Sequence, residues 1–280
     1  MSSFLDKLLG ASRTNDTLLC VGLDVDLRAV PSHLLTQAEP VLAFNRAIVE
    51  ATADLVCAYK PNLAFYEALG LEGLDALRKT LACIPRDIPV IADAKRGDVG
   101  HSAKAYAQGL FDYFGFDAVT VNPYLGRDSL QPFLDYGDRG IFVLCKTSNP
   151  GSADLQDLLT TETAPGRGCR ALYEVVAESV REWNTQGNCG LVVGATFPEE
   201  LTKVRRIAPD LPILIPGVGA QEGDLAQAVR NGVDAKGELA VVNSARQVLY
   251  ASKGQDFAKA AREIAVALRR AMNVARRQGV

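Results

Sequence analysis

Histidine and long apolar stretches are scarce in this sequence. Only two of the 280 residues are histidines, His33 and His101, so a metal site built from several histidine ligands is not expected. No apolar stretch approaches the roughly 20 residues that a transmembrane helix needs. The apolar patch near the start is interrupted by Asp6 and Lys7, unlike a signal or transit peptide. We therefore predict no metal, no membrane partner and a cytoplasmic location.

Paired cysteines and an excess of charge are also missing. None of the six cysteines forms a CxxC pair, and four of them lie in or beside apolar runs: Cys20, Cys57, Cys145 and Cys189. That placement is typical of reduced, buried cysteines in a cytoplasmic protein. The net charge of −3 provides no general attraction to nucleic acid, so no nucleic-acid partner is expected.

What the chain does contain is ordinary for a soluble globular protein. It is 48% hydrophobic and 22% charged, which is enough apolar material for a sizeable core. The length suits one large domain or two small ones, and no shift in composition marks a boundary. We therefore expect residues 1–280 to form a single domain.

Short apolar runs recur along the chain, with helical patterns between them. The runs are nearly continuous in Val, Ile and Leu, which is typical of parallel strands covered on both faces. They span residues 18–24, 55–62, 88–95, 118–124, 140–146, 190–195, 212–219 and 238–245. Apolar residues three and four apart predict helices over residues 39–54, 66–83, 99–113, 129–135, 170–183, 198–207, 225–231 and 257–276.

Eight alternating strand and helix units predict an α/β fold of the (β/α)8 TIM barrel type, and the length fits. The alternative is an open doubly wound sheet, which needs fewer units. After the fifth strand, a loop rich in Pro, Gly, Ser and Thr covers residues 146–168. Loops of that length in compact domains are usually functional lids or disordered insertions, and we favour a lid.

Charged side chains of both signs end the second and third predicted strands. Reactive groups of such barrels lie at the C-terminal ends of the strands. Asp93 and Lys95 are two residues apart on a strand and therefore share a face. Lys60 ends the neighbouring strand, and Gly97 frees the backbone to present Asp98. We predict an ionised array of Lys60, Asp93, Lys95 and Asp98, since opposite charges about 4 Å apart attract by roughly 4 kcal/mol at an effective dielectric constant near 20.

The alternating signs of the array bear on its chemistry. Carboxylates on both sides favour the ammonium form of Lys95, which can act as an acid. Imine chemistry needs a neutral amine, so an aldolase-type Schiff base on Lys95 is disfavoured. The alternative is a buried ion-pair network that only closes the barrel mouth.

A second group of residues predicts a phosphate site. The segment PGVGAQEGD follows the seventh strand, and its glycines let backbone N–H groups point at an anion. Arg246, after the eighth strand, adds a forked pair of donors. The alternative is a tight turn beside a surface arginine. Asp24 could bind a sugar hydroxyl or cap a turn, and Ser148 could contact a substrate or shape a turn; the sequence leaves both open.

Five motifs together resemble a known family. They are YKPN at 59–62, ADAKRGDVG at 92–100, KTSNPGS at 146–152, PGVGAQ at 216–221 and NSAR at 243–246. In this order, over nearly the whole chain, they resemble the orotidine 5′-phosphate decarboxylase family, and most closely its longer bacterial subgroup. The resemblance implies decarboxylation of orotidine 5′-phosphate to uridine 5′-phosphate, a nucleotide substrate, no metal and no organic cofactor.

The resemblance also implies roles for the members of the array. Lys95 is expected to donate a proton to C6 of the pyrimidine, and Asp93 to lie near the substrate carboxylate. Asp24 and Lys60 are expected to contact ribose hydroxyls, with Lys60 also paired to Asp93. The family implies a homodimer with its sites at the interface, so that Asp98 completes the array of the partner subunit.

The remaining implied contacts hold the substrate. Ser148 is expected to recognise the pyrimidine edge, and Gln221 and Arg246 to hold the 5′-phosphate. The residue after Asp98 that helps to bind substrate in the family is less defined in this chain, and Ser102 is our choice.

Two alternatives stay open. The first is a sugar-phosphate decarboxylase or synthase of the same superfamily. The active sites of that branch resemble metal-dependent sites that stabilise an enolate, with an acidic metal ligand near the second strand. Lys60 stands at that position and would repel a metal. The second is a catalytically silent nucleotide-phosphate-binding barrel, in which a Lys or Asp of the array would be lost. None is lost here.

Overall fold

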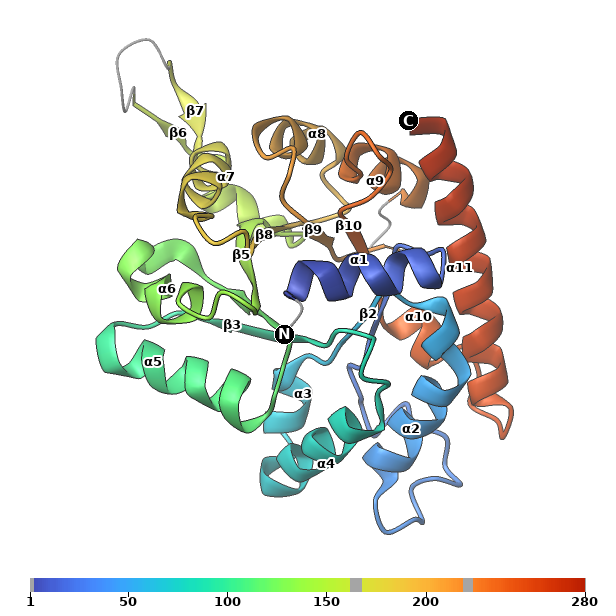
Figure 1. The fold of residues 1–280 in the computed structure, drawn as a ribbon. Coiled ribbons are helices and arrows are strands. Elements are labelled where there is room, and N and C mark those ends of the chain that lie inside the picture. The colour runs from blue at the N-terminus through green and yellow to red at the C-terminus, as the bar shows by residue number, and fades with distance from the viewer. Residues whose placement is uncertain (1–2, 162–167, 219–223, 280) are drawn as a thin grey trace.

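Eight parallel strands form the wall of a barrel in the computed structural model, which describes residues 3–161, 168–218 and 224–279 (Figure 1). The strands are hydrogen-bonded in the order β2-β1-β10-β9-β8-β5-β4-β3, and isolated bridges from Tyr59 to Val90 and from Asn62 to Asp93 join β2 to β3. All eight predicted strands are present, and the predicted TIM barrel is confirmed. The strands are β1 (Leu19–Gly22), β2 (Ala58–Lys60), β3 (Ile91–Arg96), β4 (Ala118–Val121), β5 (Gly140–Lys146), β8 (Cys189–Val193), β9 (Ile213–Ile215) and β10 (Ala240–Ser244).

Helices surround the strands (Figure 1). They are α2 (Pro40–Thr52), α3 (Leu63–Glu67), α4 (Gly70–Cys83), α5 (Gly100–Gln108), α6 (Arg127–Leu134), α7 (Leu172–Trp183), α8 (Pro198–Ile207), α9 (Leu225–Gly232), α10 (Arg246–Leu249) and α11 (Phe257–Gly279). The continuous helix predicted over 66–83 is wrong. Gly70 has a φ of +66°, a left-handed conformation that separates α3 from α4. The helix predicted over 99–113 changes after α5 into a π-helical turn at Gly109–Tyr113.

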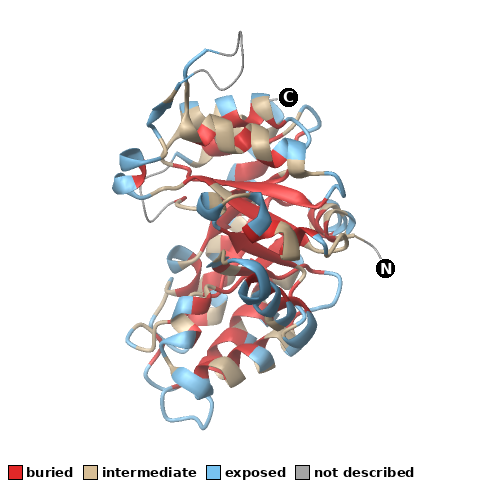
Figure 2. Cartoon of the chain, turned by 90° about the vertical axis from the view of Figure 1, so that its left-hand side faces the viewer, coloured by how far each residue is buried: buried red, intermediate tan, exposed pale blue. Residues whose placement is uncertain are grey.

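Apolar side chains are buried on both sides of the strands. Figure 2 shows buried residues along the strands and on the inner faces of the helices, with exposed residues on their outer faces. The smaller of two buried clusters fills the barrel interior, and it comprises Phe4, Leu8, Cys20, Cys57, Ala58, Ile91, Ala118, Phe142, Val192, Leu214 and Val241. The cysteines predicted to be buried and free are so: Cys20, Cys57, Cys145 and Cys189.

A helix that the sequence analysis missed, α1 (Phe4–Thr14), covers the N-terminal ends of the strands. Its first turn is closed by a capping box between Ser3 and Asp6. Phe4 packs edge to face against Phe142 of β5, with ring centroids 5.6 Å apart and planes at 88°. A Cβ atom on Gly140 would lie 2.3 Å from the Phe4 ring, so the glycine makes room for this contact. The helix therefore closes one end of the barrel.

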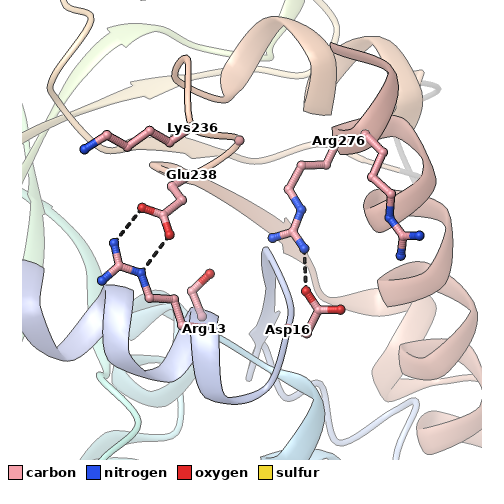
Figure 3. A pocket seen from close by; sticks show the side chains of 8 residues that line it. Arg13, Asp16, Lys236, Glu238 and Arg276 are labelled. Atoms are coloured by element: carbon pink, nitrogen blue, oxygen red, sulfur yellow. Dashed lines mark hydrogen bonds and ion pairs between the residues drawn. The ribbon is translucent and has the colours of Figure 1, made fainter. Parts of the chain in front are cut away.

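Ion pairs fasten this end of the molecule. Arg13 donates two hydrogen bonds to Glu238, at 2.7 and 2.8 Å, and Arg276 pairs with Asp16 (Figure 3). These four side chains, with Lys236 and others, line a cavity of about 570 Å³. Because Glu238 precedes β10, the cavity lies at the end opposite the predicted array.

The loop after β5 is partly built of regular structure. It contains a 3₁₀ turn, η4 (Pro150–Asp154), and a strand β6 (Leu159–Thr160), which pairs antiparallel with β7 (Arg170–Ala171). This hairpin projects from the body of the molecule in Figure 1. Residues 162–167 of the predicted loop lie outside the described residues. Among the helices of the described ranges, none combines the length and apolar character that crossing a bilayer requires.

Truncation of Phe4 tests whether α1 belongs to the core. We expect Phe4→Ala to lower the free energy of unfolding by about 3 kcal/mol, because it leaves a cavity beside Phe142. Urea denaturation measures the change. Leu71→Ala is the matched control, since Leu71 is 86% exposed and its loss should change stability by less than about 0.5 kcal/mol. Equal effects of the two substitutions would show that α1 only rests on the surface.

Candidate active site

The C-terminal ends of β2, β3 and β4 bring polar side chains into the barrel mouth. Lys60, Asp93 and Thr120 each lie two residues after a member of the interior cluster. Alternation along a strand therefore points all three side chains inward. Lys60 is 2% exposed and Thr120 is 1% exposed, although both are polar. Burial of such groups is tolerated only when they are paired.

Asp93 is the centre of a three-residue cluster. Its Oδ2 accepts a hydrogen bond from Lys60 Nζ at 2.8 Å, and its Oδ1 accepts one from Lys95 Nζ at 2.5 Å. The Asp93 side chain is 12% exposed, whereas that of Lys95 is 50% exposed. One carboxylate thus bridges a buried ammonium group and one that faces the open mouth. The structure brings together three of the four residues predicted to form the array.

The pairing overrides the effect of burial on ionisation. Burial by itself would raise the pKa of Asp93, but the Lys60 and Lys95 ammonium groups bring that pKa well below its usual range. Burial would lower the pKa of Lys60, but Asp93 and Asp24 raise it above its usual value. The buried pair is therefore ionised at neutral pH.

The backbone of Lys95 is not that of a regular strand. Its φ is +47°, and the pairing of β3 with β4 shifts register between Ala92 and Arg96. Asp93 and Lys95 do share a site, but regular strand alternation is not the reason. A bulge with one left-handed residue turns the two side chains toward each other.

Asp98 stands apart from the cluster within its own chain. Its carboxylate accepts the Val99 N–H at 2.8 Å, and within residues 3–161, 168–218 and 224–279 it forms no ion pair. Gly97, before it, lets the backbone pass close to Asn122, because a Cβ atom there would lie 2.8 Å from the Asn122 carbonyl oxygen. The chain therefore does not close the predicted array on its own Lys95.

Asp24 lies after β1 with one carboxylate oxygen unused. Its Oδ1 is buried, and no hydrogen-bond partner for it is found in the described part of the chain. Burial raises the pKa of Asp24, although Lys60 acts in the opposite direction. A buried acceptor without a donor costs free energy that a ligand hydroxyl would recover.

The predicted substrate-binding residues lie on separate segments of the chain. Arg246 begins α10 and is exposed, and Ser148 is half-buried two residues after β5. The backbone of Ser148 packs on Gly194, where a Cβ atom would lie 2.7 Å from the Ser148 Cα. Ser102 is exposed in the first turn of α5, and the structure shows no contact between it and the cluster. Gln221 lies outside the described residues.

Lys146, at the end of β5, has a role that the sequence analysis missed. It is fully buried, and its Nζ donates to Asp157 Oδ1 at 2.7 Å and to Ser152 Oγ at 3.0 Å. The same nitrogen lies 4.3 Å from the centre of the Phe197 ring. These contacts fasten the first half of the long loop to the barrel. Lys146 and Ser152 are the first and last residues of the KTSNPGS motif, but nothing in the sequence predicts their pairing or the contact with Asp157.

No group of three or more His, Cys, Asp and Glu side chains arranged to hold a metal ion is found in the described residues.

Comparisons with known proteins agree with the architecture and with the motifs. The profile of the "Orotidine 5'-phosphate decarboxylase / HUMPS family" matches residues 17–264. A protein of Herpetosiphon aurantiacus named orotidine 5′-phosphate decarboxylase is 51% identical over 265 residues, which cover 94% of this chain and 96% of the relative. A protein of the same name from Dehalococcoides mccartyi is 53% identical over 270 residues, covering 96% and 97%.

A solved structure shows the same fold. The Leishmania donovani OMP decarboxylase superposes with a TM-score of 0.82 at 40% sequence identity, covering 96% of this chain and 99% of that one. With the family profile matched over most of its length and relatives at about half identity, the chain belongs to the orotidine 5′-phosphate decarboxylase / HUMPS family.

Proposed function

We propose that this protein decarboxylates orotidine 5′-phosphate to uridine 5′-phosphate in pyrimidine biosynthesis, without a metal or an organic cofactor. The observation that carries the proposal is the Asp93 carboxylate held between Lys60 and Lys95 at the barrel mouth. The names of the curated relatives support the same reaction. A cluster that only closed the mouth would have no need of the half-exposed Lys95 ammonium group.

The reaction needs stabilisation of negative charge at one carbon. The bond from C6 to the carboxylate carbon breaks, CO2 leaves, and the electron pair stays on C6. No adjacent carbonyl group delocalises that pair. The Lys95 ammonium group, fixed beside C6, stabilises the charge as it develops and then donates its proton. Solvent returns a proton to the Lys95 amine after the product leaves.

Asp93 and Lys60 hold Lys95 in the position that this step requires. Asp93 accepts a hydrogen bond from Lys95 Nζ at 2.5 Å, and the buried Lys60 keeps Asp93 ionised when a substrate carboxylate comes near. Lys60 and Asp24 contact the ribose hydroxyls in this proposal. The unpartnered Asp24 oxygen is the observation that supports its part.

Other residues hold the nucleotide away from the reacting carbon. We assign Arg246 and Gln221 to the 5′-phosphate, Ser148 to the pyrimidine edge and Ser102 to further substrate contact. Arg246 is exposed and forms no ion pair with another described residue, which leaves its guanidinium group available to an anion. Binding energy from the phosphate can order the site, with the described part of the long loop as its lid.

We also propose a cytoplasmic homodimer whose subunits are single domains spanning residues 1–280. In the dimer, Asp98 of each subunit completes the array around Lys95 of the other. The support is that, among the described residues of its own chain, Asp98 accepts only the neighbouring backbone N–H.

An absorbance assay of orotidine 5′-phosphate in the presence of EDTA tests the reaction. We expect turnover in EDTA, and we expect Lys95→Ala to lower kcat by several orders of magnitude while the circular dichroism spectrum is unchanged. Lys203→Ala is the matched control, because Lys203 is an exposed lysine on α8 and should be neutral. Near-normal kcat in Lys95→Ala would refute the proton-donor role. Activity that appears only with a divalent metal would favour the sugar-phosphate branch instead.

Mixing two inactive variants tests the shared site. Lys95→Ala and Asp98→Ala are combined under conditions in which dimers re-form. In a mixed dimer, one site carries both defects, and the other combines an intact Lys95 with an intact Asp98 from across the interface. Random mixing then predicts recovery to roughly a quarter of wild-type activity. No recovery, with mixed dimers demonstrated by native mass spectrometry, would show that Asp98 serves its own chain.

A further inference from the structure

Thr120 is a buried residue of β4 whose hydroxyl contacts three consecutive residues of β3. Its Oγ1 accepts the N–H groups of Ala94 and Lys95, each at 3.0 Å, and donates to Asp93 Oδ1 at 3.1 Å. One hydroxyl therefore fixes the side chain of Asp93 and the backbone of the two residues that follow. Its single proton and both of its lone pairs are used in doing so.

These hydrogen bonds replace backbone hydrogen bonds between β3 and β4 that are missing where the pairing of the two strands is interrupted. The pairing of β3 with β4 is regular up to Ala92 and resumes at Arg96, and over that interval β3 advances by four residues while β4 advances by two. Residues 93–95 therefore form a bulge whose N–H groups need other acceptors. The Thr120 hydroxyl supplies an acceptor to two of them.

The bulge contains the left-handed Lys95, with its φ of +47°. The left-handed conformation is unfavourable for any residue other than glycine, and it is adopted only where surrounding contacts stabilise it. The Thr120 contact with the Lys95 N–H is one such restraint. The Arg96 guanidinium group supplies another, because it donates to the Ala94 carbonyl at 3.1 Å. The direction in which Lys95 leaves the backbone therefore depends on these contacts.

We propose that Thr120 is a positioning residue for the decarboxylation, holding Asp93 and Lys95 so that the ammonium group faces the reacting carbon. Thr120 is covered by protein and acts only through these two residues. The inference rests on the proposed function. A reacting group displaced by about 1 Å can lose on the order of 100-fold in rate, so a hydroxyl that sets its backbone matters.

Two substitutions separate the hydroxyl from the shape of the side chain. Thr120→Val keeps the shape and removes all three hydrogen bonds, and Thr120→Ser keeps the hydroxyl. We expect Thr120→Val to lower kcat by on the order of 10- to 100-fold. We expect its dissociation constant for uridine 5′-phosphate to stay at the wild-type value, because the hydrogen bonds of Thr120 in the described residues go to β3 and not to Arg246. We expect Thr120→Ser to restore most of kcat.

Thr80→Val is the matched control. Thr80 is equally buried and accepts a hydrogen bond from Asn45 Nδ2 at 3.0 Å, but it lies on α4, away from the cluster. We expect it to lower the melting temperature and leave kcat unchanged. If Thr120→Val does not fold, Thr120→Cys replaces it, because a thiol is a weak donor and acceptor.

Three results would overturn the inference in an active wild-type enzyme. They are wild-type kcat in Thr120→Val or its substitute, an equal loss of kcat in Thr120→Ser, and an equal loss in Thr80→Val. A wild-type protein that does not decarboxylate orotidine 5′-phosphate would instead refute the proposed function, so the two failures are distinguishable.

Discussion

One carboxylate holds two ammonium groups at the mouth of the barrel, and the proposed chemistry depends on that arrangement. A lysine as deeply buried as Lys60 would normally lose its proton, and a buried Asp93 would normally keep one. Each is ionised because the other is present. The pair is fixed by two neighbouring strands, so its position follows from the fold rather than from a flexible loop. Lys95 then meets a carboxylate that is already charged and already oriented.

The two ends of the barrel are built for different tasks. At the N-terminal ends of the strands, α1 and its aromatic contact close the interior, and ion pairs such as Arg13–Glu238 fasten the surrounding segments. At the C-terminal ends, buried polar atoms of Asp24 and Ser244 have no hydrogen-bond partner among the residues that the structure describes. Such atoms lower stability unless something binds them.

The barrel and part of the site could be predicted from the sequence, because buried strands appear in it as runs of apolar residues. Near-continuous apolar runs identify parallel strands, and the charged residues that end them, Lys60 and Asp93, identify a site at the mouth. Other features depend on backbone angles or on long-range contacts, which have no periodic pattern. The left-handed conformations of Gly70 and Lys95 belong to the first kind. The contacts of Thr120 belong to the second, because an apparently ordinary strand threonine becomes important only when β3 bulges beside it.

The coupling between Lys60 and Asp93 is the central claim, and a double-mutant cycle measures it directly. The free energy of unfolding is determined by urea denaturation, at one protein concentration, for the wild type, Lys60→Met, Asp93→Asn and the double variant. Each single variant leaves a buried group without its partner and is expected to lose about 3–5 kcal/mol. The account predicts that the double variant is more stable than the sum of the single losses implies, by about 3 kcal/mol. Losses that simply add would contradict it, because they would show that the two charges are held independently.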